Sequence, residues 1–547
     1  MTAATATTLG EVVADHAARR PEAPAYVTAD RVLSWAEYDA RADGLAAALV
    51  DDGVAPGDRV AVLAPDGPAV HVAYLAIERA GGVIVGIGPR AGDREVEHLL
   101  GRTGASLLCS TPETAGLAAR LGLRHRVLDD RPGPTVGATV GPTVGAAAGA
   151  SFVGRGRGVE DLWLLNSTSG TTGLPKCVMH DQARWFAFHE LAVAAGELTP
   201  DDVFMSVLPA PFGFGIWTGH VTPTVLGAPC VLMARFDADE CLALIERERV
   251  SVLAAVSTQF VMLLNAMLAN ATLRKATLRT EETLAERDLS SLRVLFTGGE
   301  MVPYRRAAEF EDRTGCAVLQ FYGSNETGAL SRTTLTDDRE HRLRTAGRII
   351  PSMHVRLFAD AAGDSDTADD DVTASGGPGI GACKGPVNCL GYYDDPEANA
   401  RLYTRDGWML TGDLCTIDGD GYLTVAGRTS DFIIRGGKNI SAAQVEEEVS
   451  THPAVVLAAA VAMPDPVFGE RVCVYVEQHQ AMAPVTLPAL CEHLDARGVG
   501  KELWPERVEV RARLPRSSGE KVAKGELRDD VRRLLVSEGA EAEVGRP

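Results

Sequence analysis

The stretch TSGTTGLPK, Thr168–Lys176, gathers in one loop the groups that bind a polyphosphate. Its glycines, Gly170 and Gly173, allow a tight turn in which backbone N–H groups come close to an anion. Lys176 adds a mobile positive charge. Four hydroxyls add further donors: those of Thr168, Ser169, Thr171 and Thr172. The apolar run DLWLLNS just before the loop predicts a buried strand, so we expect the loop at a strand end, where α/β proteins bind ligands.

This loop is not a Walker sequence, because Pro175 separates Gly173 from Lys176 and the pattern G-x-x-x-x-G-K-[ST] has no residue there. Taken alone, a run of Ser, Thr and Gly is most often an ordinary loop. The complete string resembles the phosphate loop of the adenylate-forming superfamily, which includes acyl-CoA synthetases, peptide-synthetase adenylation domains and luciferases. Such an assignment requires matching motifs elsewhere in the chain, in the same order.

Length and composition limit the class of protein. A chain of 547 residues exceeds what one hydrophobic core supports, so two or more domains are expected. The net charge of −21 argues against a nucleic-acid partner, and no apolar run reaches the length of a membrane span. The N-terminus has no secretory signal pattern. Ten scattered cysteines without a C-x-x-C pair indicate reduced thiols rather than a metal site, which favours a cytoplasmic location.

Hydrophobic periodicity predicts an α/β fold. Residues 9–130 alternate helical patterns with short apolar strands, as βαβ units do, and a second α/β stretch covers 160–350. Within the second stretch, DADECLALIERERV predicts a helix that begins at Asp237. Short β-like runs separated by Gly and Asp predict a small β subdomain over 380–427. Residues 432–547 begin with a strand, FIIR, and a helix with capping-box spacing at Ser441, which predicts a separate small α+β domain.

A second motif follows an apolar strand: QFYGSNETG, 320–328. A glutamate in a tight turn offers the oxygen ligands that Mg²⁺ prefers, although most such residues are only solvated. The string resembles the family's Y-G-x-T-E segment. That resemblance implies that Tyr322 stacks on adenine beside Gly323 and that Glu326 binds the metal. Asn325 stands where the family usually has the Thr that contacts phosphate, so this cofactor-binding position departs from the pattern.

Two further strings complete the expected nucleotide site. TGGE resembles the family's adenine-contacting Gly-Gly turn and assigns Gly299 and Glu300 to it. The carboxylate that ends WMLTGD matches the ligand of the two ribose hydroxyls, which assigns that role to Asp413. Arg428 matches the residue that contacts ribose or phosphate and belongs to the catalytic set. Without the resemblance, an aspartate there would be read as an ordinary turn residue.

The string GRTSDFIIRGGKNIS resembles the hinge on which the family's C-terminal domain rotates between two half-reactions. Ser430 takes the hinge position. The resemblance therefore implies a large multi-subdomain N-terminal domain, 1–429, and a mobile C-terminal domain, 430–547. Gly436 and Gly437 would let a pantetheine arm of CoA pass close to the backbone. A glycine-rich hairpin turn is the alternative interpretation of these residues.

Near the end of the chain, LPRSSGEKVAKGELR resembles the family's P-[RK]-T-x-x-G-K tail segment. The register assigns Lys521 to the lysine that stabilises the adenylation transition state. Glu520 stands where the family has glycine, so the match is imperfect. The implied role is electrostatic: the ammonium would bridge the attacking carboxylate and the α-phosphate. A lone lysine in a polar loop would otherwise be a solvated surface charge.

The string SVLPAPFGFGIWTGH resembles the family's acid-pocket entrance. Phe212 takes the gate position. Gly213 and Gly215 stand at or near the positions of the polar anchors that salicylate-type and α-amino acids require, which argues against both classes. Together with Phe214 and Trp217, the two glycines predict a roomy apolar pocket for a bulky aryl, alicyclic or polycyclic acid. Ordinary core packing of these aromatics remains the alternative.

The resemblance spans the chain and implies a ligase that uses ATP and Mg²⁺ to form an acyl-adenylate and then a CoA thioester. One alternative is a stand-alone acyl-AMP ligase that delivers to carrier-protein pantetheine, because Lys438 stands where CoA ligases often have Glu. Activation of nitrite for diazotisation is a more distant one. Cys177 and Asn325 depart from the motifs, so a non-catalytic nucleotide-binding relative is also considered. A homodimer is left open, because dimers are common in the family.

Overall fold

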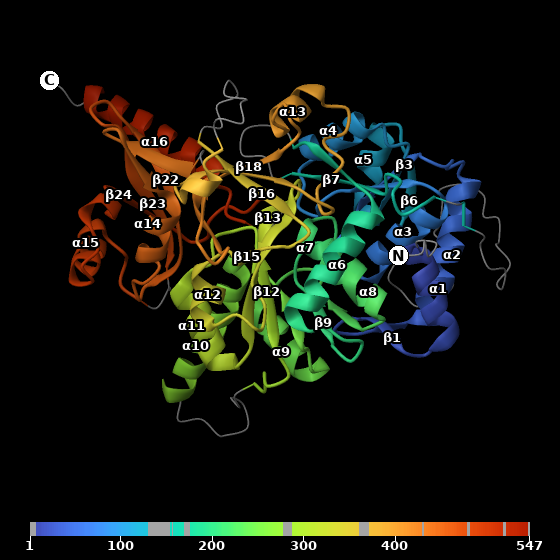
Figure 1. The fold of residues 1–547 in the computed structure, drawn as a ribbon. Helices are drawn as coiled ribbons and strands as arrows, with labels where there is room; N and C mark the ends of the chain where they lie inside the picture. The colour runs from blue at the N-terminus through green and yellow to red at the C-terminus, as the bar shows by residue number, and fades with distance from the viewer. Residues whose placement is uncertain are drawn as a thin grey trace.

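A computed structural model describes the chain over most of its length. The described residues are 7–128, 154–155, 157–168, 175–276, 287–359, 371–428, 431–478, 482–517 and 521–544. Four β-sheets organise them, with helices packed on the sheet faces (Figure 1). This arrangement confirms the predicted α/β class. Within the described ranges, none of the helices combines the length and the apolar content needed to cross a bilayer.

The first sheet has six strands in the order β6-β5-β3-β4-β7-β8. Their bounds are β3 Arg59–Leu63, β4 Val83–Gly86, β5 Leu107–Ser110, β6 Arg124–Val127, β7 Leu164–Ser167 and β8 Cys177–His180. Strands β3 to β7 are parallel, and only β8 runs antiparallel to its neighbour. The helices between these strands are α3 Pro68–Arg79, α4 Asp93–Thr103 and α5 Ala115–Arg120. The predicted βαβ rhythm is confirmed, because parallel neighbours require such crossovers.

The second sheet has nine strands in the order β15-β14-β13-β12-β11-β9-β10-β1-β2. Their bounds are β1 Pro24–Val27, β2 Val32–Ser34, β9 Phe204–Ser206, β10 Cys230–Leu232, β11 Val252–Ala254, β12 Val294–Gly298, β13 Ala317–Ser324, β14 Gly328–Arg332 and β15 Arg348–Ile349. The two α/β stretches expected from the sequence exchange strands, since β1 pairs with β10 here while β7 and β8 join the first sheet. The sequence pattern locates short apolar strands, but it does not show which strands pair with one another.

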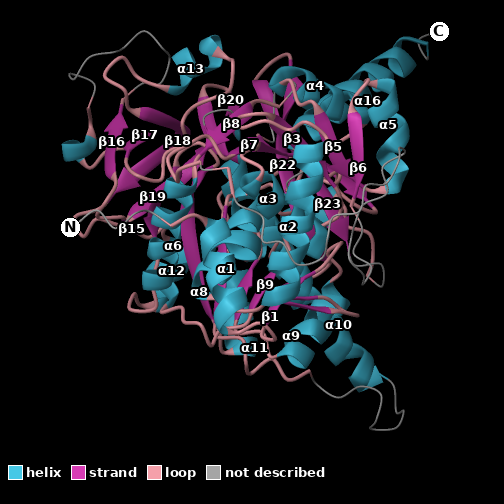
Figure 2. Ribbon diagram, turned by 90° about the vertical axis from the view of Figure 1, so that its right-hand side faces the viewer, coloured by secondary structure: helices cyan, strands magenta, loops and turns pink. Residues whose placement is uncertain are grey.

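Helices fill the space around and between these two sheets. They are α1 Leu9–Arg19, α2 Trp35–Asp51, α6 Gln182–Gly196, α7 Gly213–Gly215, a π-helical turn Ile216–Val221, α8 Thr222–Leu226, α9 Ala238–Glu248, α10 Ser257–Ala276, α11 Tyr304–Thr314 and α12 Arg339–Arg344. One apolar cluster runs from α1, α2 and α3 through α6 to β12 and β13, so both sheets share a core. Figure 2 shows α1, α2 and α3 grouped on the face turned to the viewer. Asp237 caps α9 by accepting from Glu240 N, as predicted.

A third, antiparallel sheet forms the predicted small β subdomain. Its strands are β16 His354–Phe358, β17 Gly379–Lys384, β18 Met409–Ile417 and β19 Leu423–Arg428, in chain order. The subdomain therefore begins at β16, earlier than the expected residue 380. The helix α13, Pro396–Leu402, lies between β17 and β18 in the chain.

The residues after Phe432 form the predicted α+β unit, which Figure 1 shows as an orange-to-red lobe at the left. Its strands are β20 Phe432–Arg435, β21 Lys438–Ser441, β22 Val455–Asp465, β23 Gly469–Gln478 and β24 Arg507–Arg511. Its helices are α14 Ala442–Val449, α15 Leu487–Ala496 and α16 Lys524–Val544. Ser441 caps α14 by accepting from Gln444 N at 3.4 Å, as the spacing predicted. Two apolar clusters of its own support this unit.

Alkylation of the native protein should reach one cysteine long before the other nine. Nine thiols are buried and only Cys491 is partly exposed. Burial raises the pKa of the Cys177 thiol to about 11, so it stays protonated at neutral pH. A short iodoacetamide treatment followed by mass spectrometry should find modification at Cys491 alone. Equally rapid labelling of Cys177 would contradict the packing of β8.

Candidate functional site

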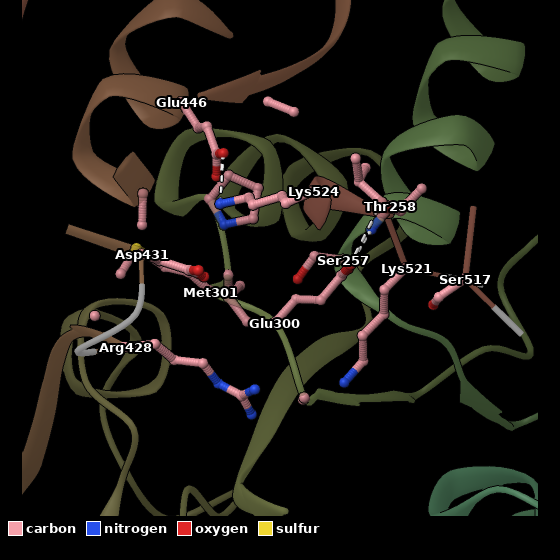
Figure 3. Close-up of a pocket in the computed structure, with 18 of the residues that line it drawn as sticks. Ser257, Thr258, Glu300, Met301, Arg428, Asp431, Glu446, Ser517, Lys521 and Lys524 are labelled. Carbon is pink, nitrogen blue, oxygen red and sulfur yellow. Dashed lines mark hydrogen bonds and ion pairs between the residues drawn. The ribbon is translucent and has the colours of Figure 1, made fainter. Parts of the chain in front are cut away.

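A cavity of about 1100 Å³ lies where the C-terminal lobe meets one edge of the nine-stranded sheet. Strands β11, β12 and β13 are parallel neighbours, so their carboxyl ends lie on the same side of the sheet, and the cavity lies at these strand ends. Ser257 follows β11, Glu300 follows β12, and Tyr322 lies near the end of β13. The lobe contributes the opposite wall, including Lys521 and Lys524 at the start of α16 (Figure 3).

The turn after β12 can be built only with glycine. A Cβ on Gly298 would lie 2.2 Å from Phe321 O, which no side chain tolerates. Gly299 has a φ of +73°, and a Cβ there would lie 2.9 Å from Lys521 Nζ. The structure thus brings the tail lysine against the glycine turn, although the two are far apart in the sequence. Glu300, the last residue of the motif, lines the same cavity and accepts from Thr258 N at 3.3 Å.

The half-buried ammonium of Lys521 stands among carboxylates. Burial lowers its pKa, because a desolvated cation is less stable. Glu300, Glu326 and Asp413 act in the opposite direction, whereas the nearby Arg428 lowers the pKa further. In Figure 3 the Lys521 side chain points into the space between Glu300 and Arg428. An anion entering this space would meet two cations, the desolvated Lys521 and the exposed Arg428.

Tyr322 of β13, in the nine-stranded sheet, forms one group with Asp413 and Arg428, which lie on neighbouring strands of the third sheet. Asp413 of β18 and Arg428 of β19 are register partners, and Arg428 Nε lies 3.4 Å from Asp413 Oδ1. Tyr322 Oη donates to Asp413 Oδ2 at 2.8 Å. Burial raises the pKa of Asp413, which is 9% exposed, while Arg428 and the Tyr322 hydroxyl oppose that rise. The ring and the carboxylate are therefore fixed relative to each other at the cavity wall.

Glu326 is held by Tyr392, which was not among the predicted site residues. Tyr392 Oη donates to Glu326 Oε1 at 2.8 Å, and Lys176 Nζ lies 4.7 Å from the centroid of the Tyr392 ring. Tyr392 belongs to the string GYYDDPE, whose family-like form was the signal available in the sequence. The backbone N of Cys389 also donates to Glu326 O at 2.7 Å. Lys176 and Glu326 are thus joined through a single aromatic side chain.

The ends of the glycine-rich loop meet beside the cavity. Thr168 N donates to Lys176 O at 3.0 Å, and Lys176 N donates to Thr168 Oγ1 at 3.3 Å. Thr168 lines the cavity. The predicted phosphate contacts between these two residues lie outside the described residues: Ser169, Gly170, Thr171, Thr172 and Gly173.

The oxygen groups at this place suit Mg²⁺ shared with a nucleotide. Glu326 supplies one carboxylate, and Mg²⁺ is usually held by one or two carboxylates together with substrate phosphates and water. Among the described residues, no three His, Cys, Asp or Glu side chains gather as metal ligands. The single carboxylate of Glu326 thus fits a metal that arrives with a polyphosphate rather than one in an all-protein cage.

The residues expected in the acid pocket divide into two groups. Trp217 is 1% exposed and packs edge-on against Phe214 and three further rings: those of Phe188, Phe296 and Phe321. A Cβ on Gly215 would lie 2.0 Å from Pro209 O. Trp217 and Gly215 therefore pack in the core, which is the alternative that the sequence left open. Phe212, Gly213 and Phe214 are half-buried, and Gly213 has space for a Cβ.

The glycines expected to pass CoA lie away from the cavity. Gly436 and Gly437 form the exposed turn between β20 and β21, with φ values of +57° and +83°. Gly436 N donates to Phe468 O at 2.8 Å. The structure therefore brings Lys521, and not this hairpin, to the nucleotide motifs. Ser430, the expected hinge, lies outside the described residues.

Comparisons with known proteins identify the family of this chain. The model of the AMP-binding enzyme family matches residues 13–393, and that of the AMP-binding enzyme C-terminal domain matches 444–521. The chain therefore belongs to the AMP-binding enzyme family, whose members are adenylate-forming enzymes. It is 34% identical over 541 residues to a feruloyl-CoA synthase of Amycolatopsis, covering 95% of this chain and 98% of that protein.

Two more relatives extend the comparison. The chain is 32% identical over 553 residues to the salicyl-AMP ligase / salicyl-S-ArCP synthetase of Mycobacterium tuberculosis, covering 97% of this chain and 92% of that protein. The crystal structure of ATP-bound MatB from Rhodopseudomonas palustris superposes with a TM-score of 0.77 at 27% identity, covering 95% and 98% of the two chains. Both likenesses extend over the large N-terminal part and the C-terminal lobe.

Alanine at Gly213 and at Gly215 should have different consequences. In the Gly215→Ala variant the new Cβ meets the Pro209 carbonyl, so the free energy of unfolding should fall by roughly 1–3 kcal/mol. In the Gly213→Ala variant the nearest atom is Asn325 Oδ1 at 4.0 Å, so stability should change by less than about 0.5 kcal/mol. Denaturant unfolding of both variants tests this. Equal losses would contradict the described packing.

Proposed function

We propose that the protein activates a hydrophobic carboxylic acid with ATP as an acyl-adenylate and then transfers the acyl group to CoA. The position of Lys521 carries this proposal. Its ammonium shares one cavity with Glu300, Asp413 and Arg428, from three different segments of the chain. A lysine among the nucleotide motifs serves the first half-reaction, in which negative charge moves from the attacking carboxylate to pyrophosphate.

In this proposal each wall of the cavity binds one part of ATP. Tyr322 and the turn at Gly299 hold adenine, while Asp413 accepts hydrogen bonds from the ribose hydroxyls. Thr168 and Lys176, with the loop between them, bind the phosphates through hydroxyl, backbone and ammonium donors. Glu326 would hold Mg²⁺, which supplies neutralising charge to the phosphates when bound.

The chemistry needs positioning and charge rather than a nucleophilic side chain. A carboxylate oxygen of the acid bonds to the α-phosphorus as the bond to pyrophosphate breaks, and the electron pair leaves with pyrophosphate. Lys521 would donate to both the acid and the α-phosphate, and Arg428 would add a second cation. Both side chains stand at the cavity before any substrate arrives, so little reorganisation is needed in the transition state.

For the second half-reaction we propose that the lobe rotates about Ser430, with the domain boundary between 1–429 and 430–547. Rotation would withdraw Lys521 and bring Gly436 and Gly437 to the acyl-adenylate. The exposed turn of β20 and β21, which has no side chain at its tip, supports a path for a narrow thiol arm. The thiol sulfur would then attack the acyl carbon and AMP would leave.

The acid itself is proposed to be bulky and aromatic or alicyclic. Phe212, Gly213 and Phe214 leave an apolar, incompletely filled segment at the expected entrance. The likeness to a feruloyl-CoA synthase supports an aryl acid. The likeness to a salicyl-AMP ligase that also acts on a carrier protein supports a second candidate: delivery of the acyl group to carrier-protein pantetheine.

Incubation with MgATP and a panel of aryl and alicyclic acids, with and without CoA, should separate the two acceptors. We expect acid-dependent pyrophosphate release and an acyl-CoA detected by mass spectrometry. An acyl-adenylate that persists with CoA and is discharged only by a pantetheinylated carrier protein would favour the second candidate. No pyrophosphate with any acid would contradict adenylation.

Replacement of Lys521 by alanine should lower the rate of adenylate formation about 10²–10³-fold, as for loss of one preorganised charge donor. Lys524→Ala is the matched control, because Lys524 lines the same cavity but is paired with Glu446 at 2.7 Å within the lobe. That variant should keep the rate within a few-fold. Pyrophosphate release measures the first step in both. Chemically supplied acyl-adenylate should still react with CoA in the Lys521→Ala variant, and equal losses in the two variants would contradict the assignment.

A further inference from the structure

A buried arginine lies behind the turn that carries Glu326. Arg184, near the start of α6, is 4% exposed. Its Nη2 donates to Asn325 O at 2.7 Å, and its Nη1 donates to the imidazole Nδ1 of His180. Burial lowers the pKa of Arg184, while Glu326 is among the groups that raise it. Burying a cation whose hydrogen-bond partners are a backbone carbonyl and a ring nitrogen costs free energy of folding. A role of Arg184 in the function of the site would explain this cost.

The arginine is one member of a closed ring of hydrogen bonds. His180 Nε2 donates to Asn166 Oδ1 at 2.7 Å. Asn166 and Asn325 exchange amide hydrogen bonds: Asn325 Nδ2 donates to Asn166 Oδ1 at 2.6 Å, and Asn166 Nδ2 donates to Asn325 Oδ1 at 3.1 Å. The ring closes where Arg184 Nη2 meets Asn325 O. Its members come from β7, β8, α6 and the end of β13.

At each contact of the ring a hydrogen-bond donor meets an acceptor. Burial and the Arg184 charge hold the pKa of His180 well below its usual range, so the imidazole is neutral. A neutral imidazole with its proton on Nε2 can donate to Asn166 and accept from Arg184 at the same time. The hydrogen bonds from Arg184 to His180, from His180 to Asn166 and from Asn166 to Asn325 run in one direction and can polarise one another, while the Asn325 amide donates back to Asn166 and closes a reciprocal pair. The ring is therefore a stiff support rather than a set of independent contacts.

This ring joins two pieces of the nucleotide site. Asn166 comes two residues before Thr168, at the start of the phosphate loop, and Asn325 comes directly before Glu326. Asn166 Nδ2 also donates to Pro211 O at 2.8 Å, and this hydrogen bond connects the segment before Phe212 to the same ring. A shift of either asparagine would change the distance between Thr168, the first residue of the loop, and the Glu326 carboxylate.

We propose that Asn166, His180, Arg184 and Asn325 are positioning residues that fix the Glu326 turn relative to the phosphate loop. This inference rests on the proposed function, in which Glu326 holds the Mg²⁺ of MgATP. It reassigns Asn325: the side chain supports the turn through Asn166 instead of contacting a phosphate. Asn166 and Asn325 are a matched pair, since each amide uses its oxygen and its nitrogen on the other.

The first test compares two buried arginines. Arg184→Met removes the donors to Asn325 O and His180, while Arg79→Met removes another buried guanidinium, on α3, that pairs with Asp39 and Asp43 of α2. The measured quantity is the Mg²⁺ concentration at which ATP half-maximally raises the melting temperature, which needs no acid and no turnover.

We expect Arg184→Met to raise this Mg²⁺ concentration roughly 10-fold or more, as for loss of an outer-shell partner of a ligand. Arg79→Met should lower the melting temperature without moving the Mg²⁺ midpoint by more than about twofold. Equal midpoints in the two variants would overturn the inference. A wild-type protein that ATP does not stabilise at any Mg²⁺ concentration would overturn the proposed function and the inference together.

A double-mutant cycle keeps the inference testable if Arg184→Met does not fold. Asn325→Ala and Asn166→Ala are combined, and the Mg²⁺ midpoint is measured for all four proteins. Because the two amides serve each other, Asn325→Ala should add less than about a twofold shift in the Asn166→Ala background. An undiminished shift in that background would show an independent phosphate contact by Asn325 and would overturn the reassignment.

Discussion

The ammonium of Lys521 reaches the cavity only because Gly299 has no side chain and adopts a positive φ. This close approach brings the segment before α16 into contact with the turn that follows β12 in the nine-stranded sheet. The lysine is desolvated there, and the three carboxylates around it offset part of that cost. Three carboxylates, those of Glu300, Glu326 and Asp413, thus act on Lys521 together with the Arg428 cation, and in the proposed function the two cations would stabilise an incoming phosphate.

The same approach limits what one arrangement of the lobe can do. While the start of α16 walls the cavity, the β20–β21 turn with Gly436 and Gly437 stays exposed on another side of the lobe. In the proposed function, charge stabilisation by Lys521 and passage of a thiol past the glycines would therefore require different lobe positions. The lobe has its own apolar clusters, so it can move as a unit without exposing a core.

Local signals in the sequence predicted local structure well, because caps and strand ends depend on neighbouring residues. Asp237 and Ser441 cap helices as expected. Contacts between distant segments could not be predicted. The spacing of apolar residues does not show that β1 pairs with β10, or that Trp217 packs against four other rings. The roles of Lys521 and Asp413 came from family resemblance. Asn166 and Asn325, 159 positions apart, carry no signal that they pair.

The negative net charge of the chain does not exclude a polyanionic substrate, because binding depends on a few poorly hydrated cations near the site and not on the total charge. The net charge of −21 is spread over the surface, where salt screens it within about 10 Å. Lys521 is desolvated at the cavity, and Arg184 lies in the interior behind the Glu326 turn. In such surroundings a single charge acts over several ångströms at low effective dielectric. In the proposed function Lys521 would face the phosphates directly, and the glycine turn at Gly299 fixes its place. Arg184 donates to Asn325 O and His180, so it would act only through the ring of side chains that supports the Glu326 turn.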